Sequence, residues 1–342
     1  MAEPTSASRR TWARYWARPR HRIAVGLLVL FMGAALLADA LASDLPLYLE
    51  LDGTRFVLPC LTHPLPLRGL DNAALQKLPA NRVGALWLPP IPFGPARTDV
   101  TAALAPPSST HWLGTDSVGR DVLARVVHGA RVSLAVGLLS TALATLIGLL
   151  LGALAGYGGG VTDVLLARSM EVVQTFPALF LLLGLLALVP SAGIVTLIAV
   201  LGLTRWVEMG RLARAETLRV RTLDYVLAAR ALGSPPWRTF AIHVLPAAAG
   251  PVLIASSLLV GSMVLLESSL AFLGLGAPPP TASWGELLSQ ARGAPAAWWL
   301  TLGPGTCIFL VVVGCNVLGE GLREALGGRS GAPAGTLPPR KL

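Results

Sequence analysis

Two acidic residues, Asp39 and Glu267, stand at the edges of long apolar stretches in this 342-residue sequence. Ionisable groups within apolar helices are costly to bury and commonly bind ions or pass protons, so both are candidates for such chemistry. Each lies near the end of its stretch, however, where water or lipid headgroups can solvate a carboxylate. Because the centres of the stretches hold no acid and no histidine, ion-coupled chemistry is the alternative hypothesis here.

No other combination of residues predicts catalysis or a bound cofactor. The five histidines are scattered, without a second metal ligand at helical spacing: His21, His63, His111, His128 and His243. Neither lysine, Lys77 or Lys341, has the glycine before it and the hydroxyl after it that a phosphate-binding GxxxxGK[ST] loop needs. The sequence also has no HExxH motif and no convincing nucleophile elbow. We therefore expect no enzyme activity, no metal and no cofactor, and energy for any work must come from another protein.

The composition indicates a membrane protein. Hydrophobic residues make up 54% of the chain and charged residues 13%, whereas soluble domains carry about 25% charged residues. The 27 Lys and Arg exceed the 18 Asp and Glu, giving a net charge of +9. A basic balance suits nucleic acid or a membrane surface, and charge this sparse favours the membrane and no nucleic acid.

Charge-free stretches predict six transmembrane helices and an all-α polytopic fold, because a bilayer core of about 30 Å needs about 20 apolar residues per helix. Residues 172–204 are too long for one crossing, and Val189–Gly193 is expected to break them into two short spans. The stretches are Ile23–Ala38 (extendable to Ala42), Val132–Thr162, Val172–Thr204, Thr239–Leu266 and Gly293–Gly319.

The arginines predict the orientation of these helices. Arginines are concentrated in the tail 1–22 and in the loop 208–246 between the fourth and fifth spans, and basic loops stay on the cytoplasmic side. An even number of spans also places the tail 324–342 there. The first span, 23–43, is expected to be an uncleaved anchor. The alternative is a secretory signal cleaved after Ala40-Leu41-Ala42, although the apolar stretch is long for one.

The segment 44–130 has a different character and is expected to form a small, irregular extracytoplasmic insertion containing β structure. It is rich in proline, and Leu47–Leu51, Asp52-Gly53 and Arg55–Leu58 together have the pattern of a β-hairpin. It is interpreted either as a cap over the helices or as a docking surface. The segment is expected to end in an amphipathic helix that starts at Thr115-Asp116-Ser117, where Asp or Ser can cap free N–H groups.

A short helix, a turn and a second helix are expected in the loop 208–246. Asp224–Leu232 is alanine-rich, Gly233 can end that helix, and Pro235-Pro236 prevents its continuation. Helical character resumes at Thr239, and Pro246 predicts a further bend. The small alanines permit close approach of another surface.

These residues resemble a known family motif. The pattern Ala228-Ala229, Gly233 and Leu245-Pro246 resembles the EAA loop of permease subunits in binding-protein-dependent ABC importers. Leu227 and His243 replace the family's glutamate and isoleucine, which is similar to the dipeptide and oligopeptide branch. Three further stretches resemble the C-type permease of that branch: 111–131, 267–276 and 278–285. The region 44–100 is longer than in ordinary members, and its hairpin resembles the microcin C/oligopeptide sub-branch. The 131–323 region corresponds to the permease core, with the first span and the insertion preceding it.

The resemblance implies a multi-pass protein of the bacterial inner membrane, in contact with membrane lipid, that translocates peptides or peptide-like compounds. It implies a heterodimer with a second permease subunit, two cytoplasmic ATP-binding subunits that hydrolyse ATP, and an extracytoplasmic peptide-binding protein. The implied ATPase-coupling residues are Asp224, Tyr225, Ala228, Ala229, Arg230, Gly233, Leu245 and Pro246. The implied outer-mouth residues are Gly114, Thr115, Asp116, Gly119, Arg120, Asp121 and Arg131.

Alternatives remain for each of these interpretations. Ala228, Ala229 and Gly233 could instead pack the loop against its own helix ends. The stretch 111–131 could be a surface amphipathic helix anchored by Trp112, serving either packing or gating. Glu267 is expected to be a structural hydrogen-bonding partner rather than a substrate ligand. For the whole chain, the alternatives are an ion-coupled secondary transporter and a membrane-anchored receptor.

Overall fold

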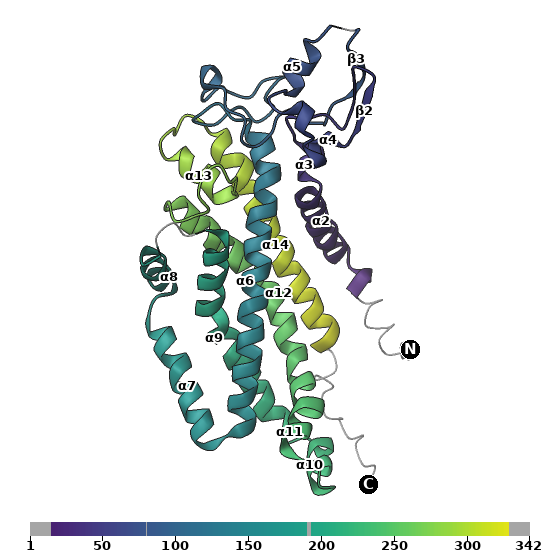
Figure 1. Cartoon of the computed structure of the whole chain (residues 1–342). Helices are drawn as coiled ribbons and strands as arrows, with labels where there is room; N and C mark the ends of the chain where they lie inside the picture. The colour runs from purple at the N-terminus through teal and green to yellow at the C-terminus, as the bar shows by residue number, and fades with distance from the viewer. Residues whose placement is uncertain (1–14, 80, 190–192, 328–342) are drawn as a thin grey trace, which may run out of the picture.

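Long helices account for most of the structure, as the apolar stretches predict. The computed structural model describes residues 15–79, 81–189 and 193–327 (Figure 1). The long helices are α2 (Pro19–Leu36), α6 (Val122–Gly158), α7 (Gly160–Thr175), α8 (Ala178–Ala187), α9 (Ile194–Val220), α12 (Leu245–Phe272) and α14 (Trp299–Gly327). Shorter helices are α3 (Ala38–Leu41), α4 (Pro59–Thr62), η1 (Leu65–Leu67), α5 (Asn72–Gln76), η2 (Val100–Ala102), α10 (Asp224–Ala231), α11 (Pro236–Thr239), the π-helical η3 (Phe240–Val244) and α13 (Trp284–Ala291).

The helical bundle has two different ends (Figure 1). The described residues between 43 and 110, which we call the cap domain, cover one end. We call that end of the bundle the cap end. The opposite end, called the loop end, carries α10 and α11. The start of α2 and the end of α14 lie between these two ends in Figure 1, well short of α10 and α11, and they are joined by ion pairs of Arg18 and Arg20 with Glu324. Most of the predicted tails 1–22 and 324–342 lie outside the described residues.

The number of membrane-spanning helices is lower than predicted when judged by length and composition. Four helical segments of the described chain qualify: Pro19–Leu36, Val122–Gly158, Pro236–Phe272 and Trp299–Ala325. The count becomes five if α7 and α8, which are bent by 86°, form one span. The expected fourth span, in α9, has only a short apolar part before charged residues begin at Arg205. The mostly helical class is therefore confirmed, whereas the count of six is not.

The helix boundaries differ most from prediction between residues 158 and 204. We expected a single break at Val189–Gly193, but α7 and α8 already meet at Phe176-Pro177. Helix α7 begins at Gly160 and contains Asp163, so a search for charge-free stretches misses its first turns. The middle of the expected break, residues 190–192, lies outside the described residues.

Helices α6 and α9 pack so closely that glycine is required at their contact. Gly148, Gly152 and Gly156 follow one another at four-residue spacing on α6, which places them on one face. A Cβ atom at Gly152 would lie 2.1 Å from the carbonyl oxygen of Gly210 on α9. Small residues at such spacing allow apolar helices to approach without side chains between them. This pair of helices forms the centre of the bundle.

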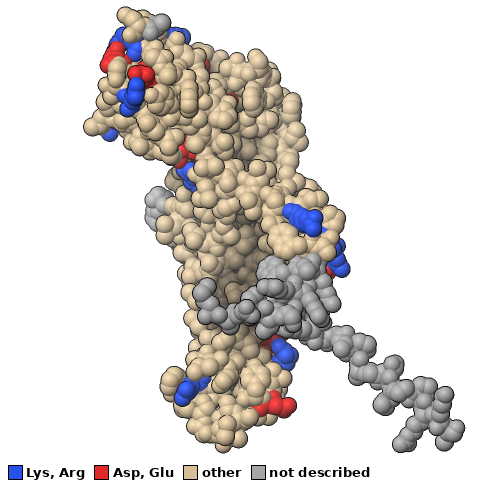
Figure 2. Space-filling view, turned by 90° about the vertical axis from the view of Figure 1, so that its right-hand side faces the viewer, with Lys and Arg blue, Asp and Glu red and all other residues tan. Residues whose placement is uncertain are grey.

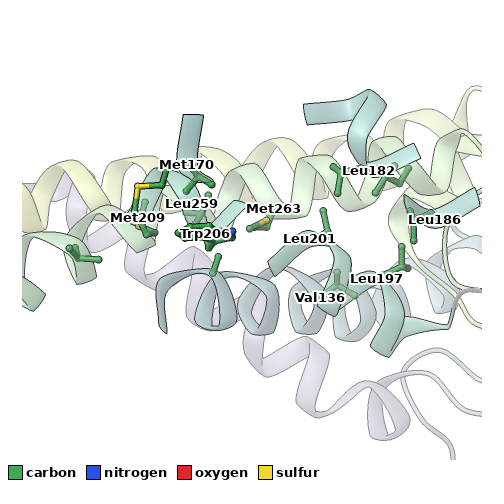
Figure 3. Close-up of a cluster of buried hydrophobic side chains, with 14 of the residues drawn as sticks. Val136, Met170, Leu182, Leu186, Leu197, Leu201, Trp206, Met209, Leu259 and Met263 are labelled. Carbon is green, nitrogen blue, oxygen red and sulfur yellow. The ribbon is translucent and has the colours of Figure 1, made fainter. Parts of the chain in front are cut away.

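The main apolar core is built around this helix pair (Figure 3). Side chains of α6 and α9 meet those of α12, with α7 and α8 closing one side. Its buried members include Val136, Met170, Leu182, Leu186, Leu197, Leu201, Trp206, Met209, Leu259 and Met263. A second cluster joins α2, α6 and α14 through residues such as Ala35, Leu134 and Val311.

The cap domain contains the predicted hairpin and an additional strand. Strands β1 (Tyr48–Leu51) and β2 (Thr54–Val57) pair antiparallel, as expected, and β3 (Val83–Trp87) joins β1 on its other side, giving the order β2-β1-β3. Asp52 and Gly53 both have positive φ, which suits a two-residue hairpin turn. Backbone hydrogen bonds of Ile91 with Leu41 and Ser43 fix the domain to the end of α3.

The predicted helix start at Thr115-Asp116-Ser117 is wrong. Residues 111–121 form a loop, and α6 begins at Val122 with Asp121 as its N-cap, whose carboxylate accepts the N–H of Ala124 at 2.7 Å. The loop is favoured because Asp116 accepts N–H bonds from Val118 and Arg120 in a tight turn rather than capping a helix. The expected amphipathic helix before residue 131 is therefore not separate, but is the first part of α6.

Candidate functional sites

The first candidate site is α10 and the turn that follows it at the loop end. Helix α10 ends in a Schellman motif: the N–H of Ser234 bonds to the carbonyl of Ala229, and that of Gly233 to the carbonyl of Arg230. This motif needs a left-handed residue after the helix, and Gly233 has φ +82°. The predicted sequence of helix, glycine turn and second helix is therefore present, with α11 beginning at Pro236.

One buried side chain anchors α10 to the bundle. Val226 is fully buried and packs with Val220 and Val244. The guanidinium of Arg230 lies 5.0 Å from the ring centre of Tyr157, whose hydroxyl donates to the carbonyl of Pro236 at 3.0 Å. The helix is therefore held against the ends of α6 and α9 from one side.

The other side of α10 and its turn is exposed and apolar. Ala228 and Gly233 are exposed, and Ala229 is half-buried. Apart from the chain neighbours of Gly233, no heavy atom of the described residues lies within 4 Å of a Cβ atom built there. Large apolar side chains share this exposure: Tyr225, Leu227, Leu232 and Trp237. Leu232 and Trp237 were not among the predicted site residues, and a search for apolar residues flanking the glycine turn would have found them.

Leu245 and Pro246 lie apart from this exposed turn. They begin α12, immediately after the π-helical turn η3, and the helix continues without a break from α11 to Phe272. Pro246 therefore does not end the helix, and it directly follows the π-helical turn η3. A wider turn next to a proline can satisfy the backbone groups that the missing N–H leaves free. Wider turns of this type occur often at functional sites.

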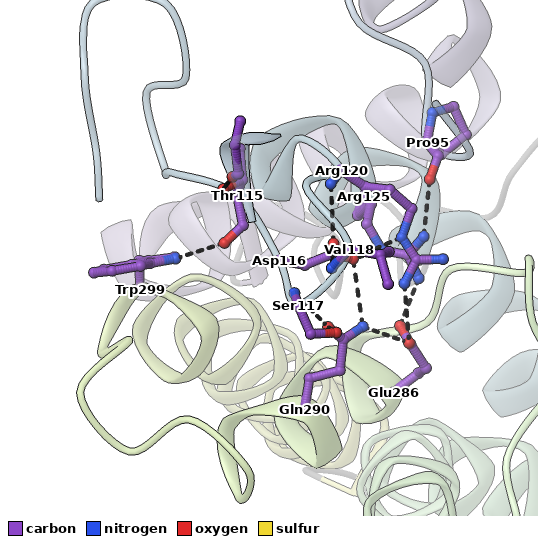
Figure 4. A network of polar contacts seen from close by, with 11 residues as sticks. Pro95, Thr115, Asp116, Ser117, Val118, Arg120, Arg125, Glu286, Gln290 and Trp299 are labelled. Carbon is purple, nitrogen blue, oxygen red and sulfur yellow. Dashed lines mark hydrogen bonds and ion pairs between the residues drawn. The ribbon is translucent and has the colours of Figure 1, made fainter. Parts of the chain in front are cut away.

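The second candidate site is a buried polar cluster at the cap end (Figure 4). Asp116 is fully buried, and its carboxylate accepts bonds from the backbone N–H groups of Val118 and Arg120 and from Nε of Arg120 at 2.7 Å. Thr115 next to it accepts the indole N–H of Trp299 at 3.0 Å through its carbonyl oxygen. Gly119 completes the turn with φ +79°, and a Cβ atom there would overlap the backbone of Asp99.

Residues outside the predicted set complete this cluster. Arg125 on α6 is fully buried, and its Nη2 lies 2.6 Å from Oε2 of Glu286 on α13. Its Nη1 donates to the carbonyl of Pro95 at 2.8 Å, and its Nε lies 3.4 Å from Asp116. Gln290 donates to Glu286 at 2.6 Å. The sequence signal for the start of α13 is the spacing Ser283-x-x-Glu286, which is typical of a capping box. In the structure Ser283 accepts the N–H of Glu286.

The remaining predicted residues of this motif have separate roles. Gly114 accepts the N–H of Val122 through its carbonyl, and Asp121 caps α6 and contacts Nδ1 of His111 at 2.8 Å. Arg131 is not part of the cluster. It lies further along α6 than Arg125. Its side chain donates to the carbonyl of Ala35 at 2.9 Å and pairs with Asp39 at 3.0 Å. Arg131 therefore connects α6 to α2 and α3.

Glu267 is fully buried, which contradicts the expectation that water or headgroups solvate it. Helix α13 folds back over the ends of α12 and α6 and excludes solvent from this position. Oε2 of Glu267 accepts the hydroxyls of Ser133 at 3.0 Å and Ser268 at 3.2 Å. Oε1 has no hydrogen-bond partner among the described residues. Ser133 in turn accepts the backbone N–H of Trp284 at 3.3 Å, so this carboxylate lies at the junction of α6, α12 and α13.

Within the described residues, no group of three or more His, Cys, Asp or Glu side chains is arranged to hold a metal ion. The polar clusters instead connect helices, and the exposed candidate surface is α10 with its turn.

Comparison with known proteins identifies the family. Residues 148–330 match the model of the "binding-protein-dependent transport system inner membrane component" family, which is more than half of the chain. The chain belongs to this family. This match contains α10, Gly233 and Glu267, and it confirms the resemblance drawn from the EAA-type pattern. It favours an importer permease over an ion-coupled carrier.

Individual relatives extend the similarity toward the amino terminus. A putative peptide permease protein of Brucella suis is 39% identical over 248 residues, covering 72% of this chain and 81% of the relative. A probable D,D-dipeptide transport system permease protein of Escherichia coli is 39% identical over 69% of this chain and 80% of the relative. The oligopeptide transport system permease protein of Bacillus subtilis is 37% identical over 67% and 75%. The chain is therefore an inner-membrane permease subunit of the ABC importer type.

Proposed function

We propose that this permease translocates peptides or peptide-like compounds, driven by ATP hydrolysis in separate subunits. The proposal rests on relatives whose names state peptide transport. These relatives are 37–39% identical to this chain over 67–72% of its length. In this proposal it pairs with a second permease subunit as a heterodimer, and receives its substrate from an extracytoplasmic binding protein. Two ATP-binding subunits lie beneath the loop end.

The observation that carries the proposal is the exposed apolar surface of α10 and its glycine turn. Exposed side chains such as Leu232 and Trp237 have no reason to face water, whereas a groove on an ATPase subunit would cover them. Ala228 and Gly233 are also exposed, which favours contact with a partner over packing against the chain's own helix ends. Tyr225, Asp224 and Arg230 lie on the same short helix and would border the contact.

Movement of α10 would reach the membrane helices by two routes. Val226 contacts Val220 at the end of α9 and Val244 before α12, so displacement of α10 pushes on both helices. Leu245 and Pro246 belong to the second route, since they join η3 to α12. In this account these two residues transmit movement and do not contact the ATPase.

For the topology, we propose six crossings, with α9 as the fourth and α7 with α8 as the third. The ion pairs that join the start of α2 to the end of α14 support placing both termini on one side of the membrane. The arginines of the amino-terminal tail and of the loop 208–246 favour the cytoplasm. We also propose that the first helix stays attached. Ala42 is fully buried and bridges to Ile91, so cleavage there would cut inside a folded contact.

At the cap end we propose structural roles. The Asp116 cluster would fix α13 to α6, and Glu267 would hold the junction beneath it, so that neither binds the substrate. The 44–110 segment is then a cap that is rigidly attached to the permease.

The test is peptide uptake by the complete importer in proteoliposomes. The account predicts uptake only with ATP on the ATPase side and the binding protein on the other side, and unchanged uptake when a proton gradient is dissipated. Uptake that is driven by a proton gradient without ATP would contradict it. Peptide binding by the chain with no uptake under any condition would favour a receptor.

A further inference from the structure

An apolar rim on the cap domain borders the membrane-spanning helices. It consists of the half-buried Tyr48 and of exposed side chains on the sheet and on the α4–η1 segment: Val57, Leu58, Leu61, Leu65 and Trp87. Val57 is 67% exposed, Leu61 52%, Leu65 69% and Trp87 69%. Residues 56–67 contain no Asp, Glu, Lys or Arg, and Arg55 and Arg68 flank them. A water-soluble surface rarely carries such an uncharged and exposed stretch.

The sheet shows that apolar character decreases with distance from the bundle. Val57, Tyr48 and Trp87 are cross-strand partners, so they share the face opposite to the buried Leu49. Two residues further from the bundle on the same face, Glu50 pairs with Arg55 at 3.7 Å.

The far end of the hairpin carries an additional ion pair. Arg82 and Asp52 lie there, 2.6 Å apart at the turn. Figure 2, which faces this side, shows the charged side chains gathered at the tip of the cap domain and few below it. The surface is therefore apolar near the bundle and charged away from it.

The height of the rim matches the edge of a bilayer. From Arg22 to Ala42 the chain runs through α2 and α3, a rise of about 30 Å at about 1.5 Å per residue, which is the thickness of a bilayer core. Helix α4 packs against α3, and His63 lines a cavity of about 420 Å³ together with Asp39. The rim thus begins where the hydrocarbon core ends.

Contacts within the cap domain fix the position of the rim. Leu58 donates its N–H to the carbonyl of Leu47, and the buried Cys60 and Leu67 hold the segment in the core of the cap domain. The backbone at Leu58 and at His63, before and after α4, is left-handed, an unusual conformation for these residues that the surrounding packing must maintain.

We propose that this rim lies in the lipid headgroup region of the membrane leaflet at the cap end, with Leu58, Leu61 and Leu65 reaching the acyl chains. Tyr48 and Trp87 occupy the position that aromatic belts take in membrane proteins, with an apolar ring and a polar edge at the headgroups. Arg68, at the other edge of the uncharged stretch, extends toward lipid phosphates. Leu36, the last residue of α2, and Leu37, which follows it, are also exposed at this end of the bundle. This anchoring goes beyond the proposed transport function and holds for any substrate.

The test measures membrane depth with spin labels in the complete importer, in nanodiscs of phosphatidylethanolamine and phosphatidylglycerol. Labels are placed at Val57→Cys and Leu61→Cys, and the matched control is Arg55→Cys on the same strand and face as Val57. The wild-type chain, treated identically, gives the background from its own cysteines. Power saturation then compares access of dissolved oxygen, which concentrates in lipid, with access of a water-soluble nickel chelate.

Labels at 57 and 61 are expected to favour oxygen, and the label at 55 the chelate. Equal access of the chelate at all three positions would overturn the proposal. A second result would also overturn it: labels at 57 and 61 that the chelate reaches in the absence of the binding protein and no longer reaches when the binding protein is added. That result would assign the rim to protein docking.

Discussion

The buried ion pair between Arg125 and Glu286 gives a quantitative test of how α13 is fixed to α6. Replacing Glu286 with Gln keeps its shape and removes its charge, leaving the fully buried guanidinium of Arg125 with Asp116 at 3.4 Å and the carbonyl of Pro95. Of the four charged groups in the cluster, two are acids and two are bases, so the variant leaves one positive charge unbalanced. Removing one partner of a buried pair costs about 3 kcal/mol.

The assay is a double-mutant cycle on the free energy of unfolding, with Arg125→Met, Glu286→Gln and the double variant. Each single variant should cost about 3 kcal/mol, and the double variant should cost less than their sum, because no unpaired charge remains. Arg168 and Glu171 provide the control: their side chains are 74% and 61% exposed, and the same cycle should give a coupling of about 0.3 kcal/mol. Equal coupling energies for the buried and the exposed pair would refute the assignment of this cluster as the connection between α13 and α6.

Two further predictions concern packing and protonation. Gly152→Ala should destabilise the chain by about 2 kcal/mol, because the new Cβ would overlap the Gly210 carbonyl. Gly26→Ala is the control and should not destabilise it, since no described atom lies within 4 Å of the new Cβ. Thermal unfolding in detergent measures the difference. A stable Gly152→Ala protein would mean that α6 and α9 are not in this contact. Burial raises the pKa of the Asp44 carboxyl, against the opposing N–H bond from Gly94. The folded cap domain therefore binds this proton more tightly than the unfolded chain, and its stability should fall as pH rises through the window between the ordinary and the raised pKa. Hydrogen exchange of the Gly94 and Asn72 amides, compared between wild type and Asp44→Asn, should show this dependence only in the wild type, and identical profiles would contradict it.

The helices, the hairpin and the glycine turn after α10 could be predicted because each depends on local sequence. Asp52-Gly53 specifies a tight hairpin turn, and Gly233 followed by Pro235-Pro236 specifies a helix end. The long apolar stretches likewise predict helices, although α7 was misplaced because Asp163 and Glu171 interrupt the apolar pattern.

Features that depend on distant residues could not be predicted in this way. Asp116 has the side chain of a helix cap, but its partners Arg125 and Gln290 come from other parts of the chain, and the folded loop is stabilised by them. Glu267 is near the end of an apolar stretch in sequence, yet α13, which follows it after a loop, covers it. Strand β3 is separated from the hairpin by α4 and α5, so its pairing with β1 has no local signal.

If α10 and its glycine turn transmit ATP hydrolysis to the permease, a bulky side chain at Gly233 should separate hydrolysis from uptake. Gly233 has φ +82° and open space around its Cβ position, and Gly53 in the cap domain matches it, with φ +77° and the same open space. Phenylalanine at either position imposes similar backbone strain, but only Gly233→Phe places a bulky side chain on the proposed ATPase contact.

The measurement is the number of peptides taken up per ATP hydrolysed by the complete importer in proteoliposomes, for both variants and the wild type. Gly233→Phe is expected to insert normally and to take up fewer peptides per ATP hydrolysed, while Gly53→Phe keeps the wild-type ratio. A wild-type ratio in Gly233→Phe would mean that α10 and its glycine turn do not couple ATP hydrolysis to transport.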